Sequence, residues 1–143
     1  MSDQDELSKR LPPALLALRL GVFLVMLMWT LDKFLNPAHA AGVFANFYKL
    51  EGLGETVFLI LGALELILLL AFVSGMYKRW TYGAVFALHA VSTLSSWSFY
   101  LGFGNLIFFA AWPMLAACFA LYILRDEDTL LTIKSSPKEA AES

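Results

Sequence analysis

The chain has 143 residues, of which 59% are hydrophobic and only 15% are charged, and its mean hydropathy is +0.69. A soluble domain of this size carries about 25% charged residues to cover its surface. The composition therefore excludes a soluble globular enzyme, and the net charge of −2 gives no indication of a nucleic-acid partner.

Four apolar segments predict membrane-spanning helices, at about residues 14–35, 56–75, 81–99 and 105–124. A helix of about 20 apolar residues matches the ~30 Å hydrocarbon core of a bilayer. The turns at 75–79 and 102–104 are short, and short turns make consecutive helices antiparallel neighbours. We therefore expect an all-α polytopic membrane protein whose residues 13–125 form an antiparallel four-helix bundle in the lipid bilayer.

The first apolar segment imitates a secretory signal peptide, because Lys9-Arg10 precedes it and Ala38-His39-Ala40 resembles a cleavage site. The apolar run is too long for a signal peptide, however, and Arg19 interrupts it. We expect a retained spanning helix that begins near Pro13, after a polar tail at 1–12.

Basic residues set the expected orientation. With four spans, Lys9-Arg10, Lys78-Arg79 and Arg125 lie on one side, and the positive-inside rule makes that side cytoplasmic. We expect both termini, including a tail at 126–143, in the cytoplasm, and the chain in a bacterial inner membrane. Loop 36–55 then lies outside, where an amphipathic segment either rests on the membrane surface or folds over the mouth of the bundle.

Cysteine and histidine usage argues against two further kinds of chemistry. Cys118 is the only cysteine, so the chain has neither an internal disulfide nor a CxxC motif, and we expect a small buried hydrophobe. His39 falls in the external loop and His89 in the middle of the third segment, so a bis-histidine haem within the chain is not expected. No metal site is predicted.

Ionisable residues inside the apolar segments are the informative polar signal. An ionisable group at the centre of a bilayer costs about 2.5–3.5 kcal/mol, so it usually faces the bundle interior and has a partner. Glu65 and His89 lie near the middle of adjacent antiparallel segments, and hence at similar depth. Arg19 lies about five residues, roughly 7 Å, into the first segment. A triad of these three residues is geometrically feasible if their faces point inward.

Helical spacing favours inward-pointing faces. One face of the first segment carries Arg19, Met26, Trp29 or Thr30, and Lys33. One face of the third carries Tyr82, His89, Ser92 or Thr93, and Ser96. We predict a polar, aromatic-walled interior that is open to the external side, with Glu65 and His89 as catalytic, proton-carrying residues. The predicted substrate-binding residues are Arg19, Trp29, Lys33, Ser96 and Trp112.

Each of these residues also has a purely structural interpretation. Arg19 and Glu65 can form an ion pair that only fixes helix packing, and His89 can be a hydrogen-bonded core residue. Lys33 can snorkel to the interface, and the serines and threonines can join helices. The sequence leaves these alternatives open.

The run Arg19-Leu20-Gly21-Val22-Phe23, followed by Lys33-Phe34, resembles the opening of the DoxX family of small four-helix membrane proteins. Glu65, an apolar run, Gly75 and Arg79 resemble the second half of that pattern, and the resemblance covers about 14–125. The turn reads Gly-Met-Tyr-Lys-Arg at 75–79, where the family often has Gly-Leu-x-Thr-Arg.

The resemblance implies Arg19, Lys33 and Glu65 as the functional positions. It also implies kinship with the membrane subunit of a thiosulfate:quinone oxidoreductase, with a membrane partner of antioxidant and sulfur-transfer proteins, and more distantly with assembly factors. His89 is not part of the family pattern and comes from the depth argument alone.

Two functional hypotheses follow. In the first, the chain is a redox-associated inner-membrane subunit that binds a quinone or a small sulfur oxyanion in the polar interior. In the second, it is a non-catalytic scaffold, assembly factor or accessory subunit of a larger membrane complex. Both imply a membrane partner subunit or a homo-oligomer, and apart from a quinone the sequence indicates no cofactor. A small-solute carrier is a third option, although no inverted repeat is detectable.

Overall fold

The computed structural model describes residues 2–134, except for the side chains of Phe47 and Asn105. Within that range the chain is helical and has no strand, as the sequence predicts. The α-helices are α1 (Asp3–Leu35), α2 (Pro37–Tyr48), α3 (Glu55–Val73), α4 (Lys78–Ser95) and α5 (Ala111–Ile123). The 3₁₀ helices are η1 (Trp97–Leu101), η2 (Phe103–Ala110) and η3 (Arg125–Glu127).

Helix α1 begins at Asp3 rather than near Pro13, where the sequence led us to expect its start. Ser2 and Asp5 form a capping box, in which the Ser2 hydroxyl accepts from the Asp5 backbone N–H and the Asp5 carboxylate accepts from the Ser2 N–H. The cap nucleates a polar first turn, and the helix then continues through Pro12 and Pro13. The start was misplaced because two prolines are a strong but not absolute helix boundary.

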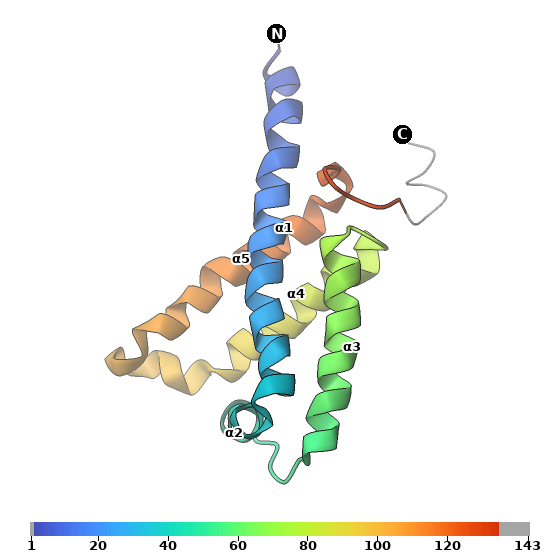
Figure 1. The fold of residues 1–143 in the computed structure, drawn as a ribbon. Helices are drawn as coiled ribbons and strands as arrows, with labels where there is room; N and C mark the ends of the chain where they lie inside the picture. Colours follow the sequence, from blue (N-terminus) through green and yellow to red (C-terminus); the bar gives the residue numbers. More distant parts are fainter. Residues whose placement is uncertain (1, 135–143) are drawn as a thin grey trace.

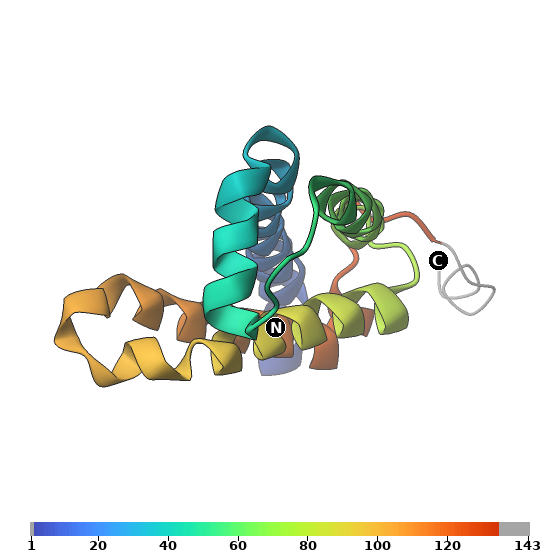
Figure 2. The same ribbon diagram turned by 90° about the horizontal axis from the view of Figure 1, so that it is seen from below.

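Helices α1, α3, α4 and α5 form two pairs. Helices α1 and α3 run antiparallel side by side, whereas α4 and α5 form a second antiparallel pair that crosses the first obliquely (Figures 1 and 2). Helix α2 lies across the ends of α1 and α3 and contacts both, with the Phe44 ring against Phe58 at 5.2 Å. The predicted amphipathic segment is therefore a helix packed on α1 and α3.

Among the described residues, three helices are long and apolar enough to cross a membrane: α1, α3 and the stretch Leu106–Ile123 that includes α5. Helix α4, which lies in the third predicted span, is not among them, so a fourth crossing is not confirmed. Lys78, Arg79 and His89 lower the hydropathy of α4, and most of these polar groups face inward. The structure is consistent with an integral membrane protein.

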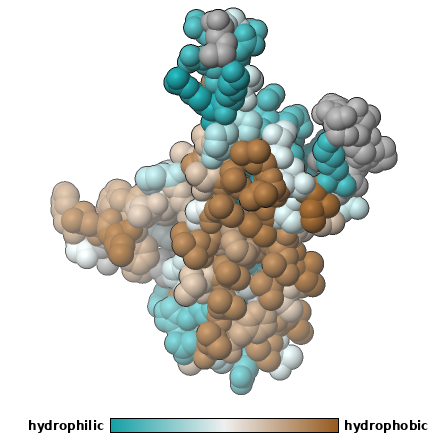
Figure 3. All heavy atoms as spheres, turned by 45° about the horizontal axis from the view of Figure 1, so that its top comes forward, coloured by the Kyte–Doolittle hydropathy of each residue, from teal (hydrophilic) through white to brown (hydrophobic). Residues whose placement is uncertain are grey.

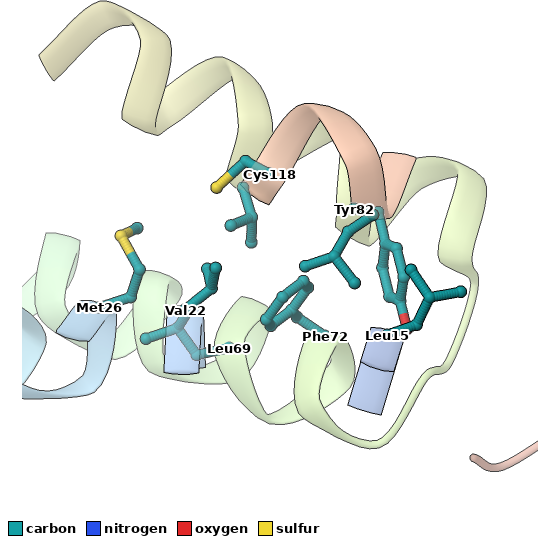
Figure 4. Packing of buried hydrophobic residues seen from close by; sticks show 9 residues of the cluster. Leu15, Val22, Met26, Leu69, Phe72, Tyr82 and Cys118 are labelled. Carbon is teal, nitrogen blue, oxygen red and sulfur yellow. The ribbon is translucent and has the colours of Figure 1, made fainter. Parts of the chain in front are cut away.

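The hydrophobic core lies where the two helix pairs cross (Figure 4). Its buried side chains come from all four long α-helices: Leu15, Val22 and Met26 of α1, Leu69 and Phe72 of α3, Tyr82 and Val85 of α4, and Cys118 and Leu121 of α5. The rings of Phe72 and Tyr82 meet edge to face at 5.0 Å. Cys118 is 2% exposed, which confirms the prediction of a small buried hydrophobe.

Most other apolar side chains face outward. In the most apolar window of α3 only 22% of the residues are buried. Figure 3 shows apolar residues as a broad band on the face in view, with hydrophilic residues gathered at the upper and lower ends. This distribution suits a surface covered by lipid rather than water.

Candidate functional site

Two separate polar clusters connect the helices, and the first joins α1 to α3. Lys33 Nζ lies 2.9 Å from Glu65 Oε2, and the two side chains are 11% and 17% exposed. The Thr30 hydroxyl lies 3.0 Å from Glu65 Oε1 and 2.8 Å from the Met26 carbonyl oxygen, so its one proton is shared between two acceptors. We call Thr30, Lys33 and Glu65 the Lys33–Glu65 cluster.

Helix packing explains why these groups meet. Thr30 and Lys33 lie three residues apart on one face of α1. On α3, Gly62 lies one turn before Glu65, and the Phe34 ring fills the space where a side chain would be. A Cβ added at Gly62 would lie 2.9 Å from Phe34 Cζ. The small residue therefore receives an aromatic ring, and Glu65 is brought opposite α1.

Arg19, in the middle of α1, belongs to a second cluster. Its Nη1 lies 2.8 Å from Asp128 Oδ1, and both side chains are 0% exposed. The Tyr82 hydroxyl donates to Asp128 Oδ2 at 2.6 Å, and Lys78 Nζ donates to the Asp128 backbone oxygen at 2.7 Å. These four residues, Arg19, Lys78, Tyr82 and Asp128, form the Asp128 cluster.

The structure does not bring Arg19 to Glu65, so the expectation of an Arg19–Glu65–His89 triad is wrong. Glu65 lies opposite Thr30, about three turns or roughly 16 Å further along α1 than Arg19. No guanidinium spans that distance, and each charge has instead taken the nearest opposite charge. Arg19 pairs with Asp128, which follows α5, and not with Glu65 as expected.

His89 contacts neither cluster. Its Nε2 lies 3.0 Å from the backbone oxygen of Ala111, and the residue is 9% exposed. Because a carbonyl oxygen only accepts, Nε2 carries the hydrogen in this contact. His89 therefore joins α4 to the first turn of α5, in agreement with the interpretation as a hydrogen-bonded core histidine.

The remaining predicted binding residues are dispersed. Trp29 is half exposed and lies 6.4 Å from the His39 ring, whereas Trp112 is 43% exposed and contacts Tyr100 at 5.6 Å. Ser96 is buried and its hydroxyl donates to the Ser92 carbonyl oxygen at 2.9 Å. The predicted aromatic-walled interior is therefore not assembled from these residues. Oblique crossing of the two helix pairs accounts for the dispersal.

The inward faces themselves were predicted well. Arg19, Met26, Thr30 and Lys33 are buried on α1. Tyr82, His89 and Thr93 are buried on α4, and Ser96 directly after it. Sequence reasoning missed Asp128, because it lies beyond the last apolar segment, where an acidic residue is ordinarily solvated. The one available signal was that Arg19 needed a counter-charge at its own end of the bundle.

Between α2 and the start of α3 a groove of about 280 Å³ is lined by Pro37, Ala38, Ala41, Leu53, Glu55 and Phe58. In residues 2–134, no group of three or more His, Cys, Asp and Glu side chains could hold a metal ion.

Comparisons with family models, curated proteins and solved structures found no match for this chain. The resemblance to the DoxX family therefore remains a prediction that rests on the residues quoted above.

Proposed function

We propose that the chain is a small DoxX-like accessory subunit, a scaffold or assembly factor, that packs against a larger membrane complex and has no catalytic centre of its own. The supporting observation is the tip of the α4–α5 hairpin, residues 97–110, which we call the hairpin tip. Among the described residues the hairpin tip packs only on itself, α4 and α5, and it projects away from α1 and α3 (Figures 1 and 2).

The hairpin tip is strongly apolar and exposed. Leu101 is 78%, Phe103 91% and Ile107 82% exposed. Its backbone forms 3₁₀ helices of 5 and 8 residues, whereas runs beyond three or four residues are uncommon because 3₁₀ hydrogen bonds have poorer geometry. A projecting apolar element of irregular helix suits a contact with another membrane protein.

The paired charges also support a non-catalytic subunit. Arg19, Lys33, Glu65 and Asp128 are each neutralised by a partner in the chain, and His89 is hydrogen-bonded to backbone. Groups in such pairs fix helix packing and registry. These pairings support a structural role for the buried charges.

The proposed topology has four crossings and both termini in the cytoplasm of a bacterial cell, with the chain in the inner membrane. The start of α4, which carries Lys78 and Arg79, lies at the same end of the molecule as Arg125 after α5 and the N-terminal part of α1 (Figure 1). We call this end the basic end. The positive-inside rule supports a cytoplasmic location for that end.

Affinity purification in a mild detergent tests the accessory-subunit proposal. The tagged chain is expected to carry a stoichiometric membrane partner, which the double variant Phe103→Ala/Ile107→Ala loses. Leu24→Ala, an equally apolar change at a 60% exposed position of α1, and Glu65→Gln are expected to retain it. Retention by the hairpin-tip variant, or loss in all three variants, would contradict the proposal.

The Lys33–Glu65 cluster favours a second candidate function, the redox-associated subunit. An acid and an amine lie 2.9 Å apart between two apolar helices, and intramembrane acids commonly carry protons. A quinone headgroup near Lys33 and Trp29 would take up two electrons from a partner subunit and two protons, delivered by way of Glu65, to form the quinol. A small sulfur oxyanion would instead bind there beside the Lys33 ammonium group. Quinone-dependent turnover in membranes is then expected to fall at least about tenfold in Glu65→Gln. Unchanged turnover in Glu65→Gln and in His89→Ala would refute this function.

A further inference from the structure

The segment after η3, residues 128–133, has its polarity reversed relative to an ordinary polar tail. We call this segment the strap; in Figure 1 it follows α5 and lies beside the α3–α4 turn. Its acidic residue, Asp128, is 0% exposed, whereas its apolar residues Leu130, Leu131 and Ile133 are 40%, 80% and 55% exposed. In water a segment would place its carboxylate outside and its leucines inside.

The backbone of the strap is hydrogen-bonded by the body of the protein. Arg19 Nη2 donates to the carbonyl oxygens of Leu130 at 2.5 Å and Leu131 at 3.3 Å. The Ile133 N–H donates to the Ser74 oxygen at 2.7 Å, and Lys78 binds the Asp128 oxygen. Irregular backbone at membrane depth is tolerated where the protein satisfies its polar groups, and these contacts do so for four backbone groups of the strap.

Arg19 also fixes the depth of the strap. It lies about five residues past the predicted membrane edge at residue 14, which is roughly 7 Å. Interfacial segments bury their apolar faces about 5–10 Å into the boundary between headgroups and acyl chains. Side chains that leave the strap away from the protein at this depth therefore meet lipid.

Local backbone conformation maintains the outward position of Leu131. Its φ is 51°, a left-handed value that costs a non-glycine residue energy and persists only where the surroundings impose it. The next residue, Thr132, packs on Gly75, where an added Cβ would lie 2.6 Å from Thr132 Cγ2. Contacts on both sides thus fix the strap in one conformation.

We propose that the strap is an interfacial membrane anchor, whose backbone and Asp128 are clasped by the basic end and whose Leu130, Leu131 and Ile133 insert into the headgroup–acyl boundary of the bilayer. The occupant of this apolar surface is lipid. The inference rests on the membrane crossing of α1 but not on either proposed activity.

Spin labels in lipid nanodiscs test the anchor. In a Cys118→Ala background, single cysteines replace Leu131, the exposed Asp126 and, on the outer surface of α3, Ile67, which is 66% exposed. Collisions of each label with oxygen, which concentrates in lipid, and with a water-soluble nickel chelate are measured by paramagnetic resonance. The label at 131 is expected to favour oxygen over nickel at least about threefold more than the label at 126.

Two outcomes would overturn the anchor. Equal nickel access at 131 and 126 would place the strap in water, and protection of 131 from both reagents would mean that protein covers it. The label at 67 separates these failures from a failure of the membrane assignment, because it favours oxygen whenever α3 lies in the bilayer.

Discussion

Replacing Asp128 with asparagine removes one charge from the most deeply buried ion pair in the described part of the chain. Arg19 and Asp128 are both 0% exposed and 2.8 Å apart, so neither charge is compensated by water when the other is lost. Breaking a buried pair in this way costs about 3–5 kcal/mol, because the remaining charge stays in a low-dielectric site. Asparagine keeps the shape of the side chain and an acceptor for the Tyr82 hydroxyl. The decrease in the free energy of unfolding therefore measures the effect of removing the charge.

Unfolding of the purified protein in mixed micelles, followed by far-ultraviolet circular dichroism during titration with dodecyl sulfate, measures this cost. Asp126→Asn, at an exposed neighbouring position, is the matched control and is expected to stay within about 0.5 kcal/mol of wild type. The double variant Arg19→Met/Asp128→Asn removes both charges and is expected to recover only part of the loss, because Arg19 also donates to the Leu130 and Leu131 carbonyl oxygens. An Asp128→Asn protein within about 1 kcal/mol of wild type would refute the buried-pair reasoning.

Four further changes can be measured in the same unfolding assay. Gly62→Ala is expected to destabilise by about 1–3 kcal/mol, because the new Cβ would lie 2.9 Å from the Phe34 ring. Gly21→Ala has nothing within 4 Å of the new Cβ and is expected to stabilise α1 by up to about 1 kcal/mol. Glu65→Gln is expected to cost about 1–3 kcal/mol, less than Asp128→Asn, because Lys33 keeps 11% exposure. His89→Leu is expected to cost about 1–2 kcal/mol through the lost hydrogen bond to backbone.

The paired glycine variants test the helix contact most directly. Equal effects of Gly62→Ala and Gly21→Ala would show that α1 and α3 do not approach each other as described. The Arg19–Asp128 pair is more deeply buried than the Lys33–Glu65 pair. A larger decrease in the free energy of unfolding for Glu65→Gln than for Asp128→Asn would contradict the reasoning from burial.

Much of the fold followed from local pattern. Hydropathy over about 20 residues predicted the helices, because a spanning helix satisfies its backbone within the segment. Helical spacing predicted the inward faces, and Arg19, Thr30, Lys33 and His89 are all buried as that spacing requires. Cys118 was likewise placed correctly in the core.

Boundaries and depth were harder to predict. The start of α1 depended on the Ser2 capping box rather than on the prolines, and the predicted fourth segment is split between η2 and α5. The position of a residue along its own helix follows from the sequence, but that position does not say which neighbour lies opposite. The predicted reach from Arg19 to Glu65 failed for that reason.

The amino-acid sequence by itself determined that this chain is helical, apolar enough for a bilayer, and amphipathic on definite faces, because those properties depend on residues within one or two turns of each other. Only the tertiary structure decided which charges neutralise which. Arg19 binds backbone oxygens 111 and 112 positions away in the chain, and it can do so because the segment after α5 folds back onto the middle of α1. The angle at which the helices cross and the path of the segment after α5 decide which charged groups meet. Neither can be read from a local sequence pattern.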